Sequence, residues 1–536
     1  MTSALVALVV VSGTTAQGKV YPLKTTVDTV APAPSVSKLP SCLTSELPSE
    51  SPLKLNRRGK YALPDKALSA ANPDTIHCLV LRFNFQYETV DNPNTTGRGQ
   101  MALTNPLATP QDSADYYNAI GHWIDPPPHD SLYFDAQMQA LSRYYESMSE
   151  GRLVLTWDVF PPKSDSVYEL PHEMGYYGNC SFDSVVVGLE MFFYDCVHTA
   201  DSVSPDIDFS QYESVFLFHA GSDRQNDIGF PTTCEDLFTG FIRFGDPVPV
   251  DGGARTVGTG LMMPETASQD NRATALNAVM AHEFGHQLGL PDIYDTRTFA
   301  THLGDFCMMD HNGFKTGVDF GDKAGSVFGI LPVYPSAWCR AFLGFADVYD
   351  FREGTDISVI AATLAASSEI EIARVPISEH EYYLIENRVQ DNDGRETGIL
   401  ADSATSVIQG PVDIETRQFT GEYDVLAPGS GLAIYRVDES VAAYDYDGDG
   451  LDNFSDNDLQ WDVDRPFLMV VEGDGVHNLT GYCAPGCGYV YQLFGWEGDL
   501  YREDRQSSFT PQTNPQALDH AGNNTHVRVT NIHRDP

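Results

Sequence analysis

Two histidines and a glutamate lie within five residues of one another near the middle of the chain. The segment His282-Glu-Phe-Gly-His286 places two imidazoles four residues apart, with Glu283 between them. On an α-helix, residues i and i+4 share one face, so both imidazoles can bind a single metal ion. Zinc is the ion that this pattern favours, and Glu283 is then the candidate general base that activates a zinc-bound water. The sequence therefore predicts a hydrolytic zinc centre.

A third protein ligand is expected from the chain that follows. Gly289 can adopt a positive φ, so the chain can turn back toward the metal, and Asp292 falls at that return position. We predict Asp292 as the third zinc ligand. Three other nearby residues offer suitable ligand atoms and remain alternatives: Asp295, Asp305 and His311. His311 has a second interpretation, in which it stabilises the oxyanion of a tetrahedral intermediate.

The zinc-binding segment needs a helix to position it. We predict that helix over residues 271–288, with Asp270 or Asn271 as its N-cap and Gly289 at its end. Apolar residues recur at helical spacing along this segment: Leu276, Val279, Met280, Phe284 and Leu288.

Met308 and Met309 follow the predicted ligands closely. They have two interpretations, as ordinary core residues or as a tight turn that forms a hydrophobic floor beneath the zinc. We favour the second, because it is similar to the Met-containing turn of metzincin-like proteases.

The elements around the zinc helix indicate an α+β fold. Before it, the residue pattern predicts strands at 77–86, 153–159 and 215–219 and a helix at 133–148. After Gly354 the pattern is typical of strands, which we expect at 357–361, 370–375, 382–387, 432–437 and 467–471. Glu386 and Arg388 lie on one of these strands and are interpreted as a structural pair.

The beginning of the chain differs from the rest. An apolar run over residues 4–11 has the length of a signal-peptide core, so we expect residues 1–17 to be a signal peptide and the product to be secreted. Residues 18–75 are rich in Pro, Ser and Lys and have no sustained periodicity, which is typical of a cleavable pro-segment. No later run is apolar over about 18 residues, the length of a membrane span, so we expect no stable membrane insertion.

The net charge excludes one class of partner. The 75 acidic and 32 basic residues give a net charge of −43, which repels nucleic acid and excludes it as an expected partner.

An exported chain can oxidise its cysteines, and Cys180 with Cys196 and Cys483 with Cys487 are the candidate pairs near in sequence. Cys42 in the pro-segment is either a free thiol or a cap for the active-site zinc. The sequence does not indicate an oligomeric state.

A second metal site is indicated in the C-terminal part. The segment from Asp445 to Asp456 matches the spacing of an EF-hand-type calcium loop, with glycine at position 6. Carboxylates packed this closely repel one another unless a cation neutralises them. No flanking helices are evident, so we expect a loop of dockerin or thrombospondin type; the alternative is a charged surface turn. The candidate calcium ligands are Asp445, Asp447, Asp449, the carbonyl of Leu451, Asn453 and Asp456.

Over about residues 76–515 the chain resembles the immune inhibitor A-like secreted zinc metalloproteases. The resemblance rests on HEFGHQLGLPDIYD at 282–295 and on segments kept in the same order, at 143–153, 218–221, 335–344, 381–388 and 429–439. It implies a proenzyme with a metzincin-like zinc protease catalytic domain, which we place at 76–350, and calcium support. A β-rich C-terminal domain at 351–536 would follow. One departure is Asp310-His311, where the family pattern is rich in Ser and Gly.

Two function classes follow. The first is a zinc-dependent endopeptidase acting on extracellular protein or peptide substrates. The second is a non-catalytic secreted adhesin or binding module with a metal-stabilised core. Intact Glu283 favours the enzyme, because a purely structural zinc site has no use for a base. A zinc hydrolase of a non-peptide bond is the third and weakest alternative.

Overall fold

The structure is a computed structural model of the chain. It describes residues 19–22, 73–104 and 124–534, the last range with gaps at 182–184, 228, 230–231, 271, 312, 314–316, 320–325, 352–355, 365–369 and 481–493. The predicted signal peptide and most of the predicted pro-segment lie outside the described residues. Helices and sheets are mixed along the chain, which confirms the α+β class.

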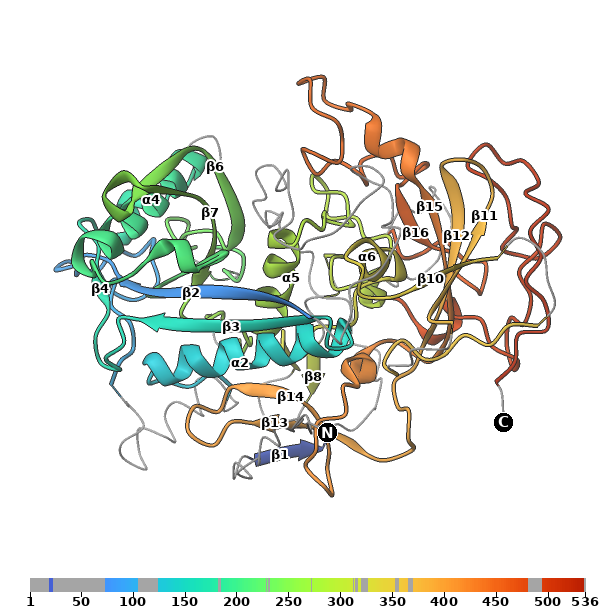
Figure 1. Ribbon diagram of the computed structural model, residues 1–536, viewed down its shortest axis with the longest axis horizontal. Helices are drawn as coiled ribbons and strands as arrows, with labels where there is room; N and C mark the ends of the chain where they lie inside the picture. The colour runs from blue at the N-terminus through green and yellow to red at the C-terminus, as the bar shows by residue number, and fades with distance from the viewer. Residues whose placement is uncertain are drawn as a thin grey trace, which may run out of the picture.

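A six-stranded sheet forms the first part of the molecule (Figure 1). Its main path runs β3-β2-β5-β7-β6, and the short β4 pairs with the end of β2. Strands β2, β3, β5 and β7 are parallel to one another, whereas β6 is antiparallel to β7 and lies at the edge. The strands are β2 (Asp74–Asn84), β3 (Leu153–Phe160), β4 (Tyr168–Glu169), β5 (Ser214–His219), β6 (Gly240–Val250) and β7 (Arg255–Pro264). Three of them confirm the strands expected from the sequence.

Helices cover both faces of this sheet. Alternate side chains of β5 point to opposite faces, and Phe216 stacks on Phe284 of α5 while Phe218 contacts Phe134 of α2. On the other face, Phe192 of α4 meets the ring of His219. The helices of this part are α2 (Ser131–Met148), α3 (Met174–Tyr177), α4 (Val185–Val203) and α5 (Asn277–Gln287). Helices α2 and α5 therefore share one face, and α2 confirms the predicted helix at 133–148.

The helix predicted to carry the zinc ligands is shorter than expected. It begins at Asn277 rather than at 271, and its N-cap is Leu276 rather than Asp270 or Asn271. The preceding chain is extended instead, because Thr274 bridges to Phe328 and the Ala275 N–H donates to the Phe328 carbonyl. Asp125, from a distant segment, accepts a hydrogen bond from the Leu276 N–H at 3.1 Å. Tertiary contacts, rather than a local cap, decide where this helix begins.

A five-stranded sheet forms the C-terminal part, on the right in Figure 1, with α5 and α6 between the two parts. Its order is β10-β11-β12-β15-β16. The strand predicted at 357–361 is absent, since Val359 and Ala361 make only isolated bridges. The remaining four predictions are confirmed by β11 (Ile372–Pro376), β12 (Glu381–Arg388), β15 (Gly431–Asp438) and β16 (Leu468–Val470); β10 (Val348–Asp350) and α6 (Ala337–Phe342) were not expected.

Two smaller sheets complete the described chain. In the first, β1 (Lys19–Pro22) is antiparallel to β13 (Thr397–Ala401), which pairs with β14 (Ile408–Asp413). A strand from the predicted pro-segment therefore joins a sheet of the C-terminal half. The second sheet is the pair β8 (Gly317–Asp319) and β9 (Ser326–Phe328). The predicted domain boundaries stay predictions, and one hydrophobic cluster runs through both halves, from Ile76 to Leu500.

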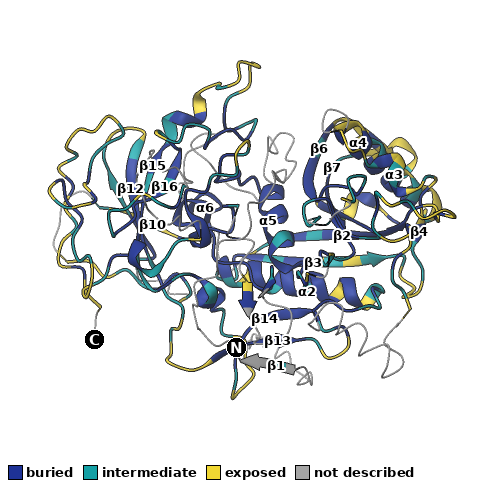
Figure 2. Cartoon of the chain, turned by 180° about the vertical axis from the view of Figure 1, so that it is seen from behind, coloured by how far each residue is buried: buried dark blue, intermediate teal, exposed yellow. Residues whose placement is uncertain are grey.

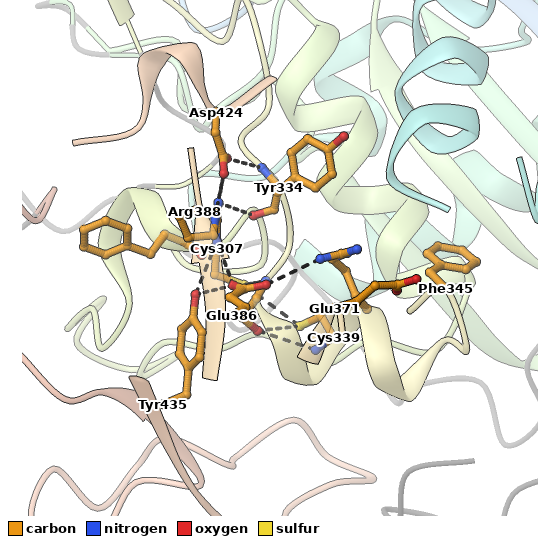
Figure 3. A network of polar contacts seen from close by, with 12 residues as sticks. Cys307, Tyr334, Cys339, Phe345, Glu371, Glu386, Arg388, Asp424 and Tyr435 are labelled. Atoms are coloured by element: carbon orange, nitrogen blue, oxygen red, sulfur yellow. Dashed lines mark hydrogen bonds and ion pairs between the residues drawn. The ribbon is translucent and has the colours of Figure 1, made fainter. Parts of the chain in front are cut away.

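A network of buried polar contacts centres on Arg388 of β12 (Figure 3). The guanidinium of Arg388 donates to Asp424 at 2.5 and 2.6 Å and to the carbonyl of Phe306 at 2.6 Å. It also contacts Glu386 at 3.2 Å, and Glu386 accepts a hydrogen bond from Tyr435 at 2.6 Å. Arg388, Glu386 and Asp424 are all fully buried, so the structural interpretation of Glu386 and Arg388 agrees with these contacts.

The predicted pairing of Cys180 with Cys196 is wrong. Cys180 forms a disulfide with Cys234, and Cys196 is a buried free thiol inside α4. Cys234 lies 54 residues after Cys180, so choosing the nearest cysteine in the sequence could not identify it as the partner. Cys42, Cys483 and Cys487 lie outside the described residues. Among the helices that the structure describes, none is long and apolar enough to cross a membrane.

Candidate functional site

Helix α5 carries the first two candidate ligands into the interior of the molecule, where Figure 2 shows it buried. His282, Glu283 and His286 are fully buried. The helix ends in a Schellman motif, because the Gly289 N–H donates to His286 and the Leu290 N–H donates to Gly285. Gly289 has a φ of +98°, the positive value expected from the sequence. This turn reverses the chain and returns Asp292 to the helix.

The structure brings His282, His286 and Asp292 together. The two Nε2 atoms lie 3.2 Å apart, and Oδ1 of Asp292 lies 3.1 Å from Nε2 of His282 and 3.3 Å from Nε2 of His286. Ligands about 2.0–2.1 Å from a tetrahedral zinc ion lie about 3.3 Å from one another. The three atoms therefore form one triangular face of a tetrahedron of the size that zinc requires.

Contacts of the other ring nitrogens fix how the imidazoles are presented. Nδ1 of His282 lies 3.0 Å from the carbonyl of Met308, and Nδ1 of His286 lies 2.8 Å from the carbonyl of Leu290. A carbonyl can only accept, so each Nδ1 carries a proton and each neutral imidazole turns the lone pair of Nε2 toward the centre. Two lone pairs and a carboxylate oxygen at these distances repel one another unless a cation lies between them. The donor set thus fits a zinc ion.

The pKa shifts of Asp292 and His286 also indicate that this site favours a positive charge. In the metal-free protein the imidazoles themselves can supply the positive charge: burial opposes ionisation of Asp292, but a protonated His286 and hydrogen bonds from both imidazoles hold the pKa of Asp292 below its usual range. Burial likewise opposes ionisation of His286, yet the neighbouring carboxylate of Asp292 raises the pKa of this imidazole. Asp292 is therefore an anion that favours positive charge beside it.

Asn457 holds Asp292 in place. Its Nδ2 donates to Oδ2 of Asp292 at 2.6 Å, and its Oδ1 accepts from the Asp292 N–H at 2.7 Å. This two-point contact engages Oδ2 of Asp292 and leaves Oδ1 facing the imidazoles. Sequence reasoning missed Asn457, because 165 residues separate it from its partner and no local pattern marks it.

Glu283 lies beside the ligands with one oxygen anchored and one free. Oε2 accepts a hydrogen bond from the N–H of Phe241 at 2.8 Å. Oε1 is buried and makes no hydrogen bond to any residue that the structure describes. Phe241 belongs to β6, the edge strand of the sheet, so the anchored carboxylate lies next to an edge to which an extended peptide can add.

Met308 and Met309 lie beneath the helix that carries the ligands. Both are fully buried. A Cβ added to Gly285 would lie 2.7 Å from Sδ of Met309 and 3.2 Å from Cε of Met308, so both methionine side chains pack closely on the helix at this glycine. The tyrosine hydroxyl of Tyr144 contacts Sδ of Met308 at 3.0 Å. This placement is compatible with a hydrophobic floor under the site, and the interpretation as a Met-containing turn stays a prediction.

The alternative third ligands have other surroundings. Asp295 pairs with Arg297 at 3.2 Å. Asp305 is buried, and burial together with the charge of Asp310 raises its pKa well above the usual range. The ring of His311 lies 5.3 Å from that of Tyr294 and 5.1 Å from that of Phe299. Asp292, in contrast, contacts both imidazoles.

The predicted calcium loop forms two overlapping acidic groups. Carboxylate oxygens of Asp445, Asp447 and Asp449 lie within 4.8 Å of one another, and the same limit holds for Asp447, Asp456 and Asp458. Burial and neighbouring carboxylates raise the pKa of Asp456 to about 6 and that of Asp458 to about 8. A bound cation would therefore favour the ionised form of both carboxyl groups.

Of the predicted calcium ligands, Asn453 has its side-chain amide engaged elsewhere in the loop, and Leu451 stays a prediction. The amide of Asn453 donates to the carbonyl of Val441 at 2.9 Å and accepts from the N–H of Tyr446 at 3.0 Å, so both ends of this side chain serve the loop backbone. Leu451, predicted to contribute its carbonyl, is an exposed residue of the same loop. Asp458 was not predicted, although it lies only two residues beyond the expected last ligand.

Two helix-borne imidazoles, the carboxylate of Asp292 as candidate third ligand and a second carboxylate with an unbonded oxygen are typical of metallohydrolases. Within that class, residues 241–344 match the model described as the immune inhibitor A peptidase M6, catalytic domain. The match includes β6, β7, α5, Asp292 and both methionines. The match confirms the resemblance to the immune inhibitor A-like family over this part of the chain, which is similar to a peptidase catalytic domain. No curated protein matches the chain.

Proposed function

We propose that the protein is a secreted zinc-dependent endopeptidase in which His282, His286 and Asp292 hold the metal and Glu283 is the general base. The observation that carries this proposal is the triangle of Nε2, Nε2 and Oδ1 atoms, with edges of 3.1–3.3 Å, beside the free oxygen of Glu283. When bound, zinc supplies Lewis-acid chemistry that polarises the scissile carbonyl and lowers the pKa of a water molecule.

The protein's own groups account for the proton transfers. Oε1 of Glu283 takes a proton from the water that attacks the carbonyl carbon, and the C–N bond of the peptide then breaks. The same carboxyl group passes the proton to the leaving amine nitrogen. The N–H of Phe241 holds Oε2 and so keeps Oε1 directed into the site. An adhesin with a structural metal would have no use for such an anchored, unshared carboxylate.

Two features support a location outside the cell. The apolar run at residues 4–11 is typical of a signal peptide. The disulfide between Cys180 and Cys234 fits an oxidising compartment. The substrates proposed are therefore extracellular proteins or peptides.

Chelation tests the proposed function. The purified protein should contain about one zinc ion per chain at the α5 site. Removing zinc with 1,10-phenanthroline should abolish the cleavage of casein or gelatin, and added zinc should restore it. Cleavage that continues at full rate after all zinc is removed would contradict the proposal. Stoichiometric zinc without cleavage of any protein would favour the adhesin.

We further propose that the acidic loop from Asp445 to Asp458 binds calcium. Asp447 belongs to both acidic groups, so its loss should weaken either arrangement. Calcium should raise the midpoint of thermal unfolding of the parent protein, and the Asp447→Ala variant should lose that rise while unfolding like the parent in EGTA. Identical unfolding curves of the parent with and without calcium would remove this site.

A further inference from the structure

Asn457 lies between two residues of the acidic loop. Its neighbours in the chain, Asp456 and Asp458, share a group with Asp447. Its own side chain points elsewhere and makes the two-point contact with Asp292. One short stretch of backbone therefore carries two carboxylates of the candidate cation site and the amide that holds a candidate zinc ligand.

The carboxylates of this group lack the contacts that buried anions need. Both oxygens of Asp456 are buried and make no hydrogen bond to any described residue. Asp458 is only 5% exposed. Oxygens of both residues lie within 4.8 Å of one another and of an oxygen of Asp447. Carboxylates at such distances, one of them with both oxygens buried and unbonded, favour a hard cation between them.

The same stretch is attached to the chain that follows the zinc helix. The indole N–H of Trp461 donates to Thr296 at 2.8 Å, and Arg297 donates to the Trp461 carbonyl at 2.7 Å while its guanidinium lies over the indole ring. Asn457 itself has a φ of +68°, a conformation that asparagine tolerates better than most residues. The backbone conformation at position 457 therefore suits asparagine, where the acidic loop meets the chain that follows α5.

We infer that a divalent cation bound by Asp447, Asp456 and Asp458 keeps Asn457 against Asp292 and thereby strengthens zinc binding. Asn457 is a positioning residue: it acts on the zinc through Asp292. Without the cation, repulsion among the three carboxylates spreads the loop, and the backbone between Asp456 and Asp458 draws the amide away from Asp292. This inference rests on the proposed function, because it assigns Asp292 to zinc.

Zinc affinity measured with and without calcium tests the coupling. The full-length protein is stripped of metal, and its zinc affinity is determined by competition with a chromophoric chelator, in calcium-free buffer without EGTA and in millimolar calcium. Loss of a partner that orients a metal ligand typically costs 10–100-fold in metal affinity, so calcium should tighten zinc binding by about that factor. The readout is binding, and it does not depend on protease activity.

The critical variant is Asn457→Gly, which removes the amide without straining the positive φ. It should bind zinc about 10–100-fold more weakly than the calcium-loaded parent, with no response to calcium. Asn531→Gly is the matched control, because Asn531 is an exposed asparagine with a φ of +59°; it should respond like the parent. Asp393→Asn, which removes one charge from another acidic group, should also keep the response.

Two results would overturn the coupling: equal zinc affinity of the parent with and without calcium, or a full calcium response in Asn457→Gly. Failure of the proposed function looks different, because the parent and all variants would then bind no zinc at this site under either condition.

Discussion

Replacement of Glu283 by Gln should lower kcat/KM for a peptide substrate by about 10²–10⁴-fold, the contribution typical of a general base. The amide has the same shape, and its oxygen can still accept the hydrogen bond that the Phe241 N–H now gives to Oε2. It cannot take a proton from water. The variant should therefore bind zinc as the parent does and fold normally, so the loss should fall on kcat. Peptide cleavage and zinc content measured on the same preparation check this prediction.

Glu190→Gln is the matched control for that variant. Glu190 is an exposed residue of α4, and its replacement changes the net charge by the same amount. It should leave kcat/KM unchanged. Activity at the parental level in zinc-loaded Glu283→Gln would remove Glu283 from the role of base.

Replacement of Arg388 by Met should destabilise the protein by about 3–5 kcal/mol, the cost typical of removing one partner of a buried ion pair. The substitution leaves Asp424 without its two short hydrogen bonds from the guanidinium and Glu386 without its ion pair. It also frees the carbonyl of Phe306, which precedes the segment that contains both methionines. The midpoint of urea unfolding, followed by tryptophan fluorescence, should shift to lower urea.

Two further variants separate the network from a general effect of losing an arginine. Arg395 is itself exposed where it pairs with Asp393 and Asp413, and backbone N–H groups also donate to Asp413, so Arg395→Met should leave the midpoint nearly unchanged. Arg388→Lys keeps the charge but loses the planar fork, so it should recover only part of the stability. Equal shifts for Arg388→Met and Arg395→Met would contradict the importance of the buried network.

The parts of the site that were predictable depend on local spacing. His282 and His286 share a helix face whatever surrounds them, and Gly289 ends the helix by a motif that involves only its neighbours. The contacts that complete the site come from elsewhere. Asp125 caps the helix from 151 residues away, and Asn457 reaches Asp292 across 165 residues. Neither contact leaves a periodic or spacing signal near the residues it affects.

The same distinction explains the errors in the fold. Strands β2, β5, β12 and β15 have strong apolar or alternating patterns, and all were predicted. The segment 357–361 has a similar composition but pairs only through isolated bridges, because composition does not determine whether a neighbouring strand is available. Cys180 likewise found its partner in a distant loop rather than in the nearest cysteine.

The most direct test of the zinc site is a crystal structure of the zinc-loaded Glu283→Gln protein with anomalous data collected on both sides of the zinc absorption edge. We predict one strong anomalous peak at the centre of the triangle, about 2.0–2.2 Å from Nε2 of His282, Nε2 of His286 and Oδ1 of Asp292. A peak coordinated by other residues, or no peak in protein that contains stoichiometric zinc, would contradict the assignment of these three ligands.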